Sequence, residues 1–242
     1  KDLRGRRWPR MHREGRKLRV VVIPTLNMDG RMRHAEVTHF LDRDAAEYRE
    51  ICQGDWKTGE KITWPKSKLH FPIPPDQVKK MGGYFNDCGV NLVYDTGLGC
   101  DPQPETAALL RLCREEMPDC AICSHTNRGS LVESPDSFIP SYFRQRQVQI
   151  AGAVGARCLR DGVIRRYGFP QRTQSYAGEV LYQTDLIYHT CGALPLLVEF
   201  PTGYKNFPYT FHEVLDIGMA VLEEILCFGT ADRFRPQDPQ RK

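Results

Sequence analysis

The sequence predicts an α/β fold: a mixed, mostly parallel, twisted sheet with helices on both faces. One observation is a set of short apolar runs without polar alternation, which is typical of strands buried on both faces. These runs are residues 18–24, 119–126 and 193–200. Stretches with helical spacing of apolar residues alternate with the runs, which is the order of elements in parallel α/β sheets. These stretches are residues 104–117, 140–158 and 209–227.

Composition narrows the class of protein. With 242 residues, 40% of them hydrophobic and 26% charged, the chain can bury a substantial core. The net charge is +4, and much of the positive charge crowds into residues 1–19 without the motifs of nucleic-acid readers. No apolar run approaches the ~20 residues that cross a bilayer. We therefore expect no nucleic-acid partner and no membrane span, and we interpret the basic cluster as a solvated lead-in.

The nine cysteines are odd in number and irregular in spacing. They do not suggest a disulfide framework, and they favour a cytoplasmic location. Cys120 and Cys123 form a Cys-x-x-Cys, but no second pair with zinc-ribbon spacing exists. Because residues three apart in a strand point to opposite faces, we interpret both as small buried apolar residues.

Residues 18–24 give the clearest strand signal, a β-branched run followed at once by a proline. Residues 25–30 contain Asn, Asp and Gly, and predict a tight turn with a positive φ at Gly30. Arg31 and Arg33 follow close to the strand's C-terminal end. There a guanidinium could hold a carboxylate through two parallel hydrogen bonds, although most surface arginines have no such role.

The alternation of strands and helices is lost between residue 34 and about residue 80. We expect a short helix at 44–52 and a small hairpin over 56–65 that turns at Thr58–Gly59. Three prolines between residues 72 and 75 oppose regular structure. Long excursions of this kind are usually functional or disordered, and two tryptophans favour an ordered flap here.

The stretch 104–117 has the marks of a helix, since a proline and a glutamate suit its first turn and Pro118 ends it. The strand at 119–126 then brings His125 to its C-terminal end. Ligands bind at that edge of open α/β sheets, so a metal-competent side chain there is placed for chemistry. The alternative is a strand-end histidine that hydrogen-bonds to a neighbouring loop.

The second half of the chain continues the alternation. Residues 140–158 predict a helix, residues 161–178 are irregular, and residues 185–190 fit a short helix or turn. The strand at 193–200 carries Glu199 in an apolar context. A buried glutamate is costly unless it is paired, metal-bound or protonated, so Glu199 is a functional candidate.

These elements predict one large domain. Its last element is an amphipathic helix over about 209–227 that ends near Gly229. The divisions are a basic lead-in at 1–17, a single α/β domain at 18–230 with an elaborated loop or flap at 34–80, and a polar tail at 231–242.

Four motifs occur in order along the chain. They are Asn27-Met28-Asp29-Gly30 after a buried run, Pro104-Glu105-Thr106 at a helix start, Pro118-Asp119 before a strand that ends in His125-Thr126, and Leu197-Val198-Glu199 in the last strand. Together they resemble the Asn-Pro-Asp-Gly, Pro-Glu-Thr, Pro-Asp to His-Ser and Thr-Val-Glu motifs of the zinc carboxypeptidases of the M14 (carboxypeptidase A-like) family. The resemblance covers about Leu18 to Cys227.

The resemblance implies a zinc carboxypeptidase-like fold and a metallopeptidase. Such a hydrolase uses metal-activated water to cleave a peptide or amide bond near a free carboxylate. It implies one Zn²⁺ ion with His125 as a ligand and Glu199 as the general base. It also implies a mobile tyrosine before the catalytic strand, for which Tyr176 has about the right separation and Tyr182 and Tyr188 are rivals.

The chain departs from the family's zinc motif. The family supplies two further ligands from a His-x-x-Glu well upstream of the Asn-Pro-Asp-Gly strand. Here only His12-Arg13-Glu14 lies upstream, with the wrong spacing. We expect that the chain is N-terminally truncated; the alternative is descent from a peptidase that lost its metal.

The chain also departs from the family's substrate clamp. Val93 and Tyr94 stand where an Asn-Arg pair would hold the substrate's carboxylate. Arg31, Arg33 and Arg128 are candidates to replace it. Two alternatives to the peptidase stay open: a catalytically inactive domain that binds a peptide or partner, and an aspartoacylase-like deacylase of small N-acyl amino acids. The oligomeric state is not predicted.

Overall fold

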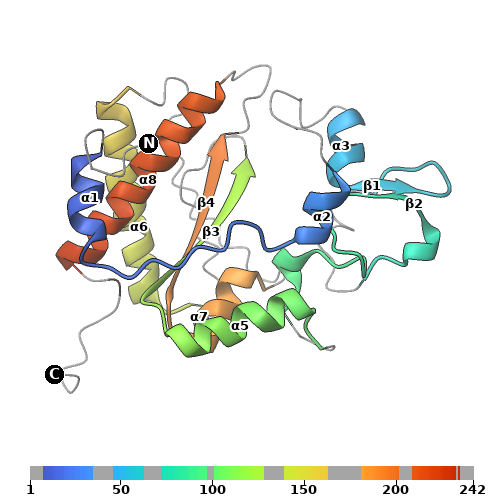
Figure 1. The fold of residues 1–242 in the computed structure, drawn as a ribbon, viewed down its shortest axis with the longest axis horizontal. Helices are drawn as coiled ribbons and strands as arrows, with labels where there is room; N and C mark the ends of the chain where they lie inside the picture. Colours follow the sequence, from blue (N-terminus) through green and yellow to red (C-terminus); the bar gives the residue numbers. More distant parts are fainter. Residues whose placement is uncertain are drawn as a thin grey trace.

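The computed structural model describes residues 8–34, 46–62, 72–96, 101–127, 139–162, 181–201, 209–232 and 234. Within them the chain has a mixed α/β architecture built on two small sheets. A parallel pair of strands lies between two groups of helices, and an antiparallel pair lies toward one end of the molecule (Figure 1). The prediction of a mixed α/β fold is confirmed at this level, and the described strands do not form one large sheet.

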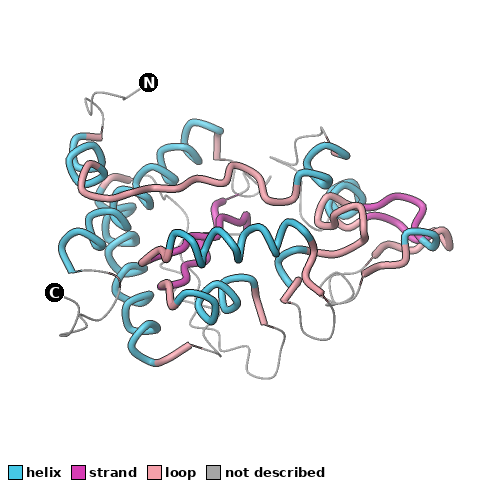
Figure 2. The backbone as a smooth tube through the Cα atoms, turned by 60° about the horizontal axis from the view of Figure 1, so that its bottom comes forward, coloured by secondary structure: helices cyan, strands magenta, loops and turns pink. Residues whose placement is uncertain are grey.

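The parallel pair consists of β3 (Cys120–Asn127) and β4 (Leu194–Pro201). The register runs from Cys120 beside Leu194 to Asn127 beside Pro201. Helices α6 and α8 lie on one side of the pair, and α5 and α7 lie on the other (Figures 1 and 2). The predicted strands at 119–126 and 193–200, with helices on both faces, are therefore confirmed.

The larger core lies between β4 and the helices α6 (Ser141–Arg160) and α8 (Phe211–Asp232). Its fully buried side chains come from every third or fourth position of each helix and from alternate positions of β4. They include Ile150, Val154, Leu194, Leu196, Val198, Ile217 and Val221. α8 was expected to end near Gly229, but it continues to Asp232. The aromatic ring of Phe234 lies where a side chain at Gly229 would project, so the glycine gives the ring room.

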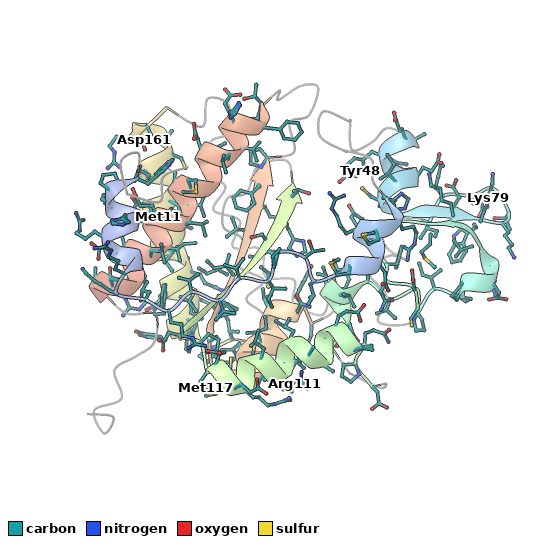
Figure 3. All side chains as sticks on the ribbon, in the orientation of Figure 1. Met11, Tyr48, Lys79, Arg111, Met117 and Asp161 are labelled. Carbon is teal, nitrogen blue, oxygen red and sulfur yellow. The ribbon has the colours of Figure 1, made fainter. Side chains whose placement is uncertain are left out.

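The smaller core lies between the strands and the helices α5 (Pro104–Glu116) and α7 (Gln183–Cys191). α5 begins as predicted, with a proline in the first turn, and its C-cap is Met117 (Figure 3), which adopts the left-handed conformation with φ 45°. The C-cap of α7 is Gly192, a residue suited to its φ of 68°. Of the short helix or turn predicted at 185–190, the structure has the helix, and it is longer than predicted.

One face of β3 is open over most of its length, and only its first residue, Cys120, packs against the larger core on that face. Ile122 is 37% exposed, and Ser124 and Thr126 on the same face are also exposed. α6 and α8 pack over β4, so their side chains leave this face of β3 open. The prediction that this strand is buried on both faces is therefore wrong.

The predicted strand at 18–24 is also wrong. These residues form no strand, and Val20, Val21, Val22 and Ile23 are between 43% and 72% exposed. The segment is stretched from α1 toward α2 across the front of the molecule (Figure 1), with an ion pair from Arg19 to Glu116 near its start. β-branched residues favour strands when a neighbouring strand packs against them, and in the described residues this run has no such neighbour.

Helix α1 (Pro9–Gly15) is attached to α8 by charged groups. Arg10 pairs with Glu224 at 2.7 Å, and the backbone N–H of Met11 donates to Glu223 at 2.8 Å. Glu14 accepts from Lys17 at 2.6 Å and from Thr230 at 2.9 Å. The described part of the lead-in, residues 8–17, is therefore docked on α8 through these groups, whereas the sequence predicts a solvated segment.

The predicted tight turn at residues 25–30 is wrong, because a helix, α2 (Met28–Arg33), begins within this segment. The side chain of Asn27 caps the helix by accepting from the backbone N–H of Gly30 at 2.9 Å. Gly30 has no positive φ. A glycine is needed at position 30 because a Cβ atom there would lie 2.2 Å from the carbonyl oxygen of Gly83.

The excursion after residue 34 contains an ordered lobe. It consists of α3 (Ala46–Cys52), β1 (Gly54–Trp56), a 3₁₀ turn η1 (Pro75–Gln77), β2 (Val78–Met81) and a second 3₁₀ turn η2 (Leu92–Tyr94). β1 and β2 are antiparallel, and the lobe has its own apolar core of Ile62, Ile73, Val78 and Phe85. The predicted turn at Thr58–Gly59 is present, with Gly59 at φ 88°, and the remainder of that hairpin from residue 63 lies outside the described residues. None of the helices in the described ranges is both long and apolar enough to span a bilayer.

Candidate functional site at the strand ends

The candidate site is built on the C-terminal ends of β3 and β4. The register places His125 directly beside Glu199. Registered residues of adjacent parallel strands lie about 5 Å apart and project on the same face of the sheet. Ala121 and Cys123, which alternate with His125, pack into the core with α5 and α7. His125 and Glu199 therefore project on the α5 and α7 side, and the expected meeting of the two residues is found.

His125 is half-buried, and burial lowers the pKa of its imidazole below the usual 6.5. The ring is therefore neutral at neutral pH. A neutral imidazole has one nitrogen that can accept a proton or bind a metal ion.

Glu199 is only 7% exposed, in a strand whose other residues are almost all apolar and buried. Its burial was predicted from the sequence and is confirmed. Removing a carboxylate from water is costly, and the neighbouring imidazole of His125 is a polar group on the same face. A carboxylate beside an imidazole at a strand end is an arrangement that can take up and release protons.

The helices α5 and α7 directly precede β3 and β4 in the chain. At the start of α7, the carboxylate of Asp185 accepts from the backbone N–H of Tyr182 at 2.9 Å. At the start of α5, Asp95 accepts from the backbone N–H of Gln103 at 2.8 Å. A carboxylate therefore accepts from the backbone at the start of each of these helices.

A third element, η2, packs against the start of α7. Gln183 donates to the carbonyl of Leu92 at 3.3 Å, and the rings of Tyr94 and Tyr182 have centroids 5.3 Å apart. Tyr94 is 3% exposed. Tyr94 is thus held in a buried aromatic contact at the start of α7. This contact has no signal in the sequence, because Tyr94 and Tyr182 meet only when η2 packs against α7.

The two arginines proposed as substrate contacts lie on α2. Arg33 donates to the carbonyls of Gly82 and Phe85, each at 3.1 Å, and pairs with Asp87. Arg31 donates to the carbonyl of His34 at 3.4 Å. The structure thus places both beside or within the lobe's loop, rather than on the strands that carry His125 and Glu199. Tyr176 and Arg128 lie outside the described residues.

The described residues do not by themselves make a zinc site. A catalytic zinc ion takes three protein ligands, and the part of the chain that the structure describes contains no group of three His, Cys, Asp or Glu side chains able to hold a metal. His125 is one potential ligand. Burial raises the pKa of Cys123 to about 12 and also raises that of Cys120, so both thiols stay protonated. They pack against opposite cores, as the strand periodicity predicts, but both are half-buried rather than buried.

Comparisons with protein-family models, with curated proteins and with solved structures found no match to this chain. The candidate function therefore depends on the chemistry of the site and on the sequence motifs.

Proposed function

We propose that this chain carries the catalytic base and one metal ligand of a zinc-dependent hydrolase that cleaves a peptide or amide bond near a carboxylate. Glu199 is the general base and His125 is a zinc ligand. The observation that carries the proposal is the register of β3 and β4, which puts a buried carboxylate directly beside a neutral imidazole at the C-terminal ends of two parallel strands.

The roles follow from the environment of each group. The lowered pKa of His125 keeps a lone pair available for a metal ion at neutral pH. Glu199, held at the same edge, is placed to accept a proton from a water molecule on that face and to pass it to the leaving nitrogen. A zinc ion at such a site supplies an acidified water and polarises the scissile carbonyl.

The proposal requires two more zinc ligands besides His125. Because no three-ligand group occurs among the described residues, these ligands would have to come from undescribed positions or from polypeptide outside this sequence. His125 alone cannot hold the ion, so we expect no tight stoichiometric zinc binding by this chain unless its undescribed positions supply the other ligands.

The test uses the longest polypeptide that contains this sequence. Its zinc content is measured by elemental mass spectrometry, together with hydrolysis of blocked peptides with free and amidated C-termini and of small N-acyl amino acids. Glu199→Gln should keep the zinc and lower hydrolysis by at least about a hundredfold, because general-base catalysis contributes roughly that much. His125→Gln should lose both zinc and activity. The substrate panel separates a carboxypeptidase from a deacylase.

A matched control is Glu116→Gln, which removes a surface carboxylate that pairs with Arg19. This variant should retain both zinc and activity. A metal-free longer protein would overturn the proposal, as would a Glu199→Gln variant with full activity.

A catalytically inactive binding domain is the second candidate. It is favoured by the lack of a three-ligand group in the described ranges and by the Tyr94–Tyr182 contact at the clamp position. This candidate predicts that peptides bind equally well with zinc or with a chelator present, and that Glu199→Gln does not weaken binding. Fluorescence anisotropy of labelled peptides would measure both.

A further inference from the structure

Three thiols meet in the small core between α5, α7 and β3. Cys113 and Cys191 are buried, at 5% and 6% exposed, and Cys123 packs against them from β3. All three are free cysteines. Aliphatic side chains would fill the same core, so packing alone does not account for three sulfur atoms in one cluster.

Two of the three thiols form a pair. Cys113 and Cys191 pack together in this core, and Cys191 donates to the carbonyl of Ile187 at 3.3 Å. The helices that carry them, α5 and α7, pack directly together. Cys113 lies in the last turn of α5 and Cys191 is the last residue of α7. The pair therefore lies toward the N-terminal edge of the strands, opposite the edge that carries His125 and Glu199.

We propose that Cys113 and Cys191 are a redox pair that closes to a disulfide when the protein meets a peroxide, and that the disulfide stabilises the α5–α7 layer. One sulfur attacks a peroxide oxygen, the O–O bond breaks, and a sulfenic acid and hydroxide form. The second sulfur attacks the sulfenic sulfur, the S–S bond forms, and hydroxide leaves. Two thiols and one hydrogen peroxide give one disulfide and two waters, with sulfur oxidised and peroxide oxygen reduced.

The burial of Cys113 makes the rate of this oxidation depend on pH. Burial raises the pKa of Cys113 to about 11, so the reactive thiolate is scarce at neutral pH and the reduced form persists. Oxidation should accelerate as the pH is raised. The disulfide would close a long loop that contains β3 and α6, which restricts the unfolded chain more than the folded one.

The test begins with the unaltered protein. It is treated with hydrogen peroxide at mildly alkaline pH, remaining thiols are blocked under denaturing conditions, and peptides are mapped by mass spectrometry. We expect a linked pair of peptides carrying Cys113 and Cys191, lighter than the two reduced peptides by two hydrogen atoms. We also expect the melting temperature to rise by several degrees and to return on reduction with dithiothreitol.

Cys123→Ser is the matched control, since it removes the third thiol and should keep the link. Cys113→Ser and Cys191→Ser should each lose both the link and the rise in melting temperature. A link that involves Cys123, or recovery of Cys113 and Cys191 as unlinked peptides after peroxide treatment, would overturn the proposal. Because the map is made on the unaltered protein, the outcome depends neither on the folding of the variants nor on any hydrolase activity.

Discussion

His125 and Glu199 put an imidazole and a carboxylate side by side in a two-stranded parallel sheet. The strand register puts them side by side, and burial keeps the imidazole neutral. These two properties have a consequence for stability that can be measured without knowing the substrate.

Replacing His125 by Gln should flatten the dependence of stability on pH. Burial makes the pKa of His125 lower in the folded protein than its unfolded value near 6.5. Above pH 6.5 the histidine is neutral in both the folded and the unfolded protein, so it does not change the free energy of unfolding with pH. As the pH falls below it, the unfolded chain binds the proton first, so the free energy of unfolding decreases. In urea denaturation, the free energy of unfolding should fall more between pH 7.5 and pH 5 for the natural protein than for His125→Gln.

His189 offers a control for this comparison because it is exposed. His189→Gln should follow the natural protein at both pH values. An equal loss of stability in the natural protein and in His125→Gln would contradict the assignment of the effect to His125.

The site was partly predictable from the sequence. Two apolar runs that end in His125 and Glu199 predict parallel strands whose C-terminal ends meet at one edge, and their adjacency follows. The contact of Tyr94 with Tyr182 was not predictable, since it depends on where η2 lies relative to α7. The pattern of residues 18–24 predicts a strand and would put Arg31 and Arg33 at this edge, but these residues form no strand and both arginines lie on α2.

Among the elements, the clearest errors concern residues 18–24 and the turn that follows. A β-branched run and an Asn-Asp-Gly segment each favour a local structure, but neither reports what packs against it. Residues 18–24 have no neighbouring strand within the described chain, and Asn27 serves as a helix cap. By contrast, residues 104–116 were predictable because the proline start and the apolar spacing are properties of the helix itself.

Two valines separate strand propensity from packing. Val198 is fully buried in β4, whereas Val22 is 72% exposed. Val198→Ala should lower the free energy of unfolding by about 2 kcal/mol, because it leaves a cavity in a packed core. Val22→Ala should change it by less than about 0.5 kcal/mol. Chemical denaturation of both variants checks this, and equal losses would mean that residues 18–24 are packed as a strand in solution.

Alanine substitutions at two helical glycines test how closely α2 approaches the backbone of the lobe at Gly83. Gly30→Ala should destabilise the protein by about 1–3 kcal/mol, since its Cβ would lie 2.2 Å from a backbone oxygen of Gly83. Gly152→Ala in α6 should stabilise the protein by about 0.5–1 kcal/mol, because nothing lies within 4 Å of the added Cβ. The two variants have the same chemistry and opposite expected signs. Thermal unfolding measures both, and a stabilising Gly30→Ala would contradict the placement of α2 against the lobe.

In the part of the molecule that the structure describes, separate apolar cores are held together by individual contacts. The larger core joins α6, α8 and β4, and the smaller joins α5, α7 and the strands. The lobe has two apolar clusters of its own. Arg157 pairs with Glu223, Glu224 and Asp161, so it ties α6 to α8 next to the point where α1 is attached; Asp161 is labelled in Figure 3. The architecture of each core follows from apolar spacing, whereas the arrangement of the cores depends on such individual contacts.

The exposure of residues 18–24 makes this connection between α1 and α2 a substrate for proteases. Proteases bind extended, accessible backbone, and thermolysin cuts before valine and isoleucine, which this segment presents. α1 would nevertheless stay in place after cleavage, because Arg10, Met11 and Glu14 bind α8 on the far side of the cut. Brief digestion should therefore give two fragments on a denaturing gel and one particle of unchanged mass by size-exclusion chromatography. Release of the N-terminal fragment would contradict the docking of α1; its retention would mean that two separate polypeptides reproduce the fold of the intact chain.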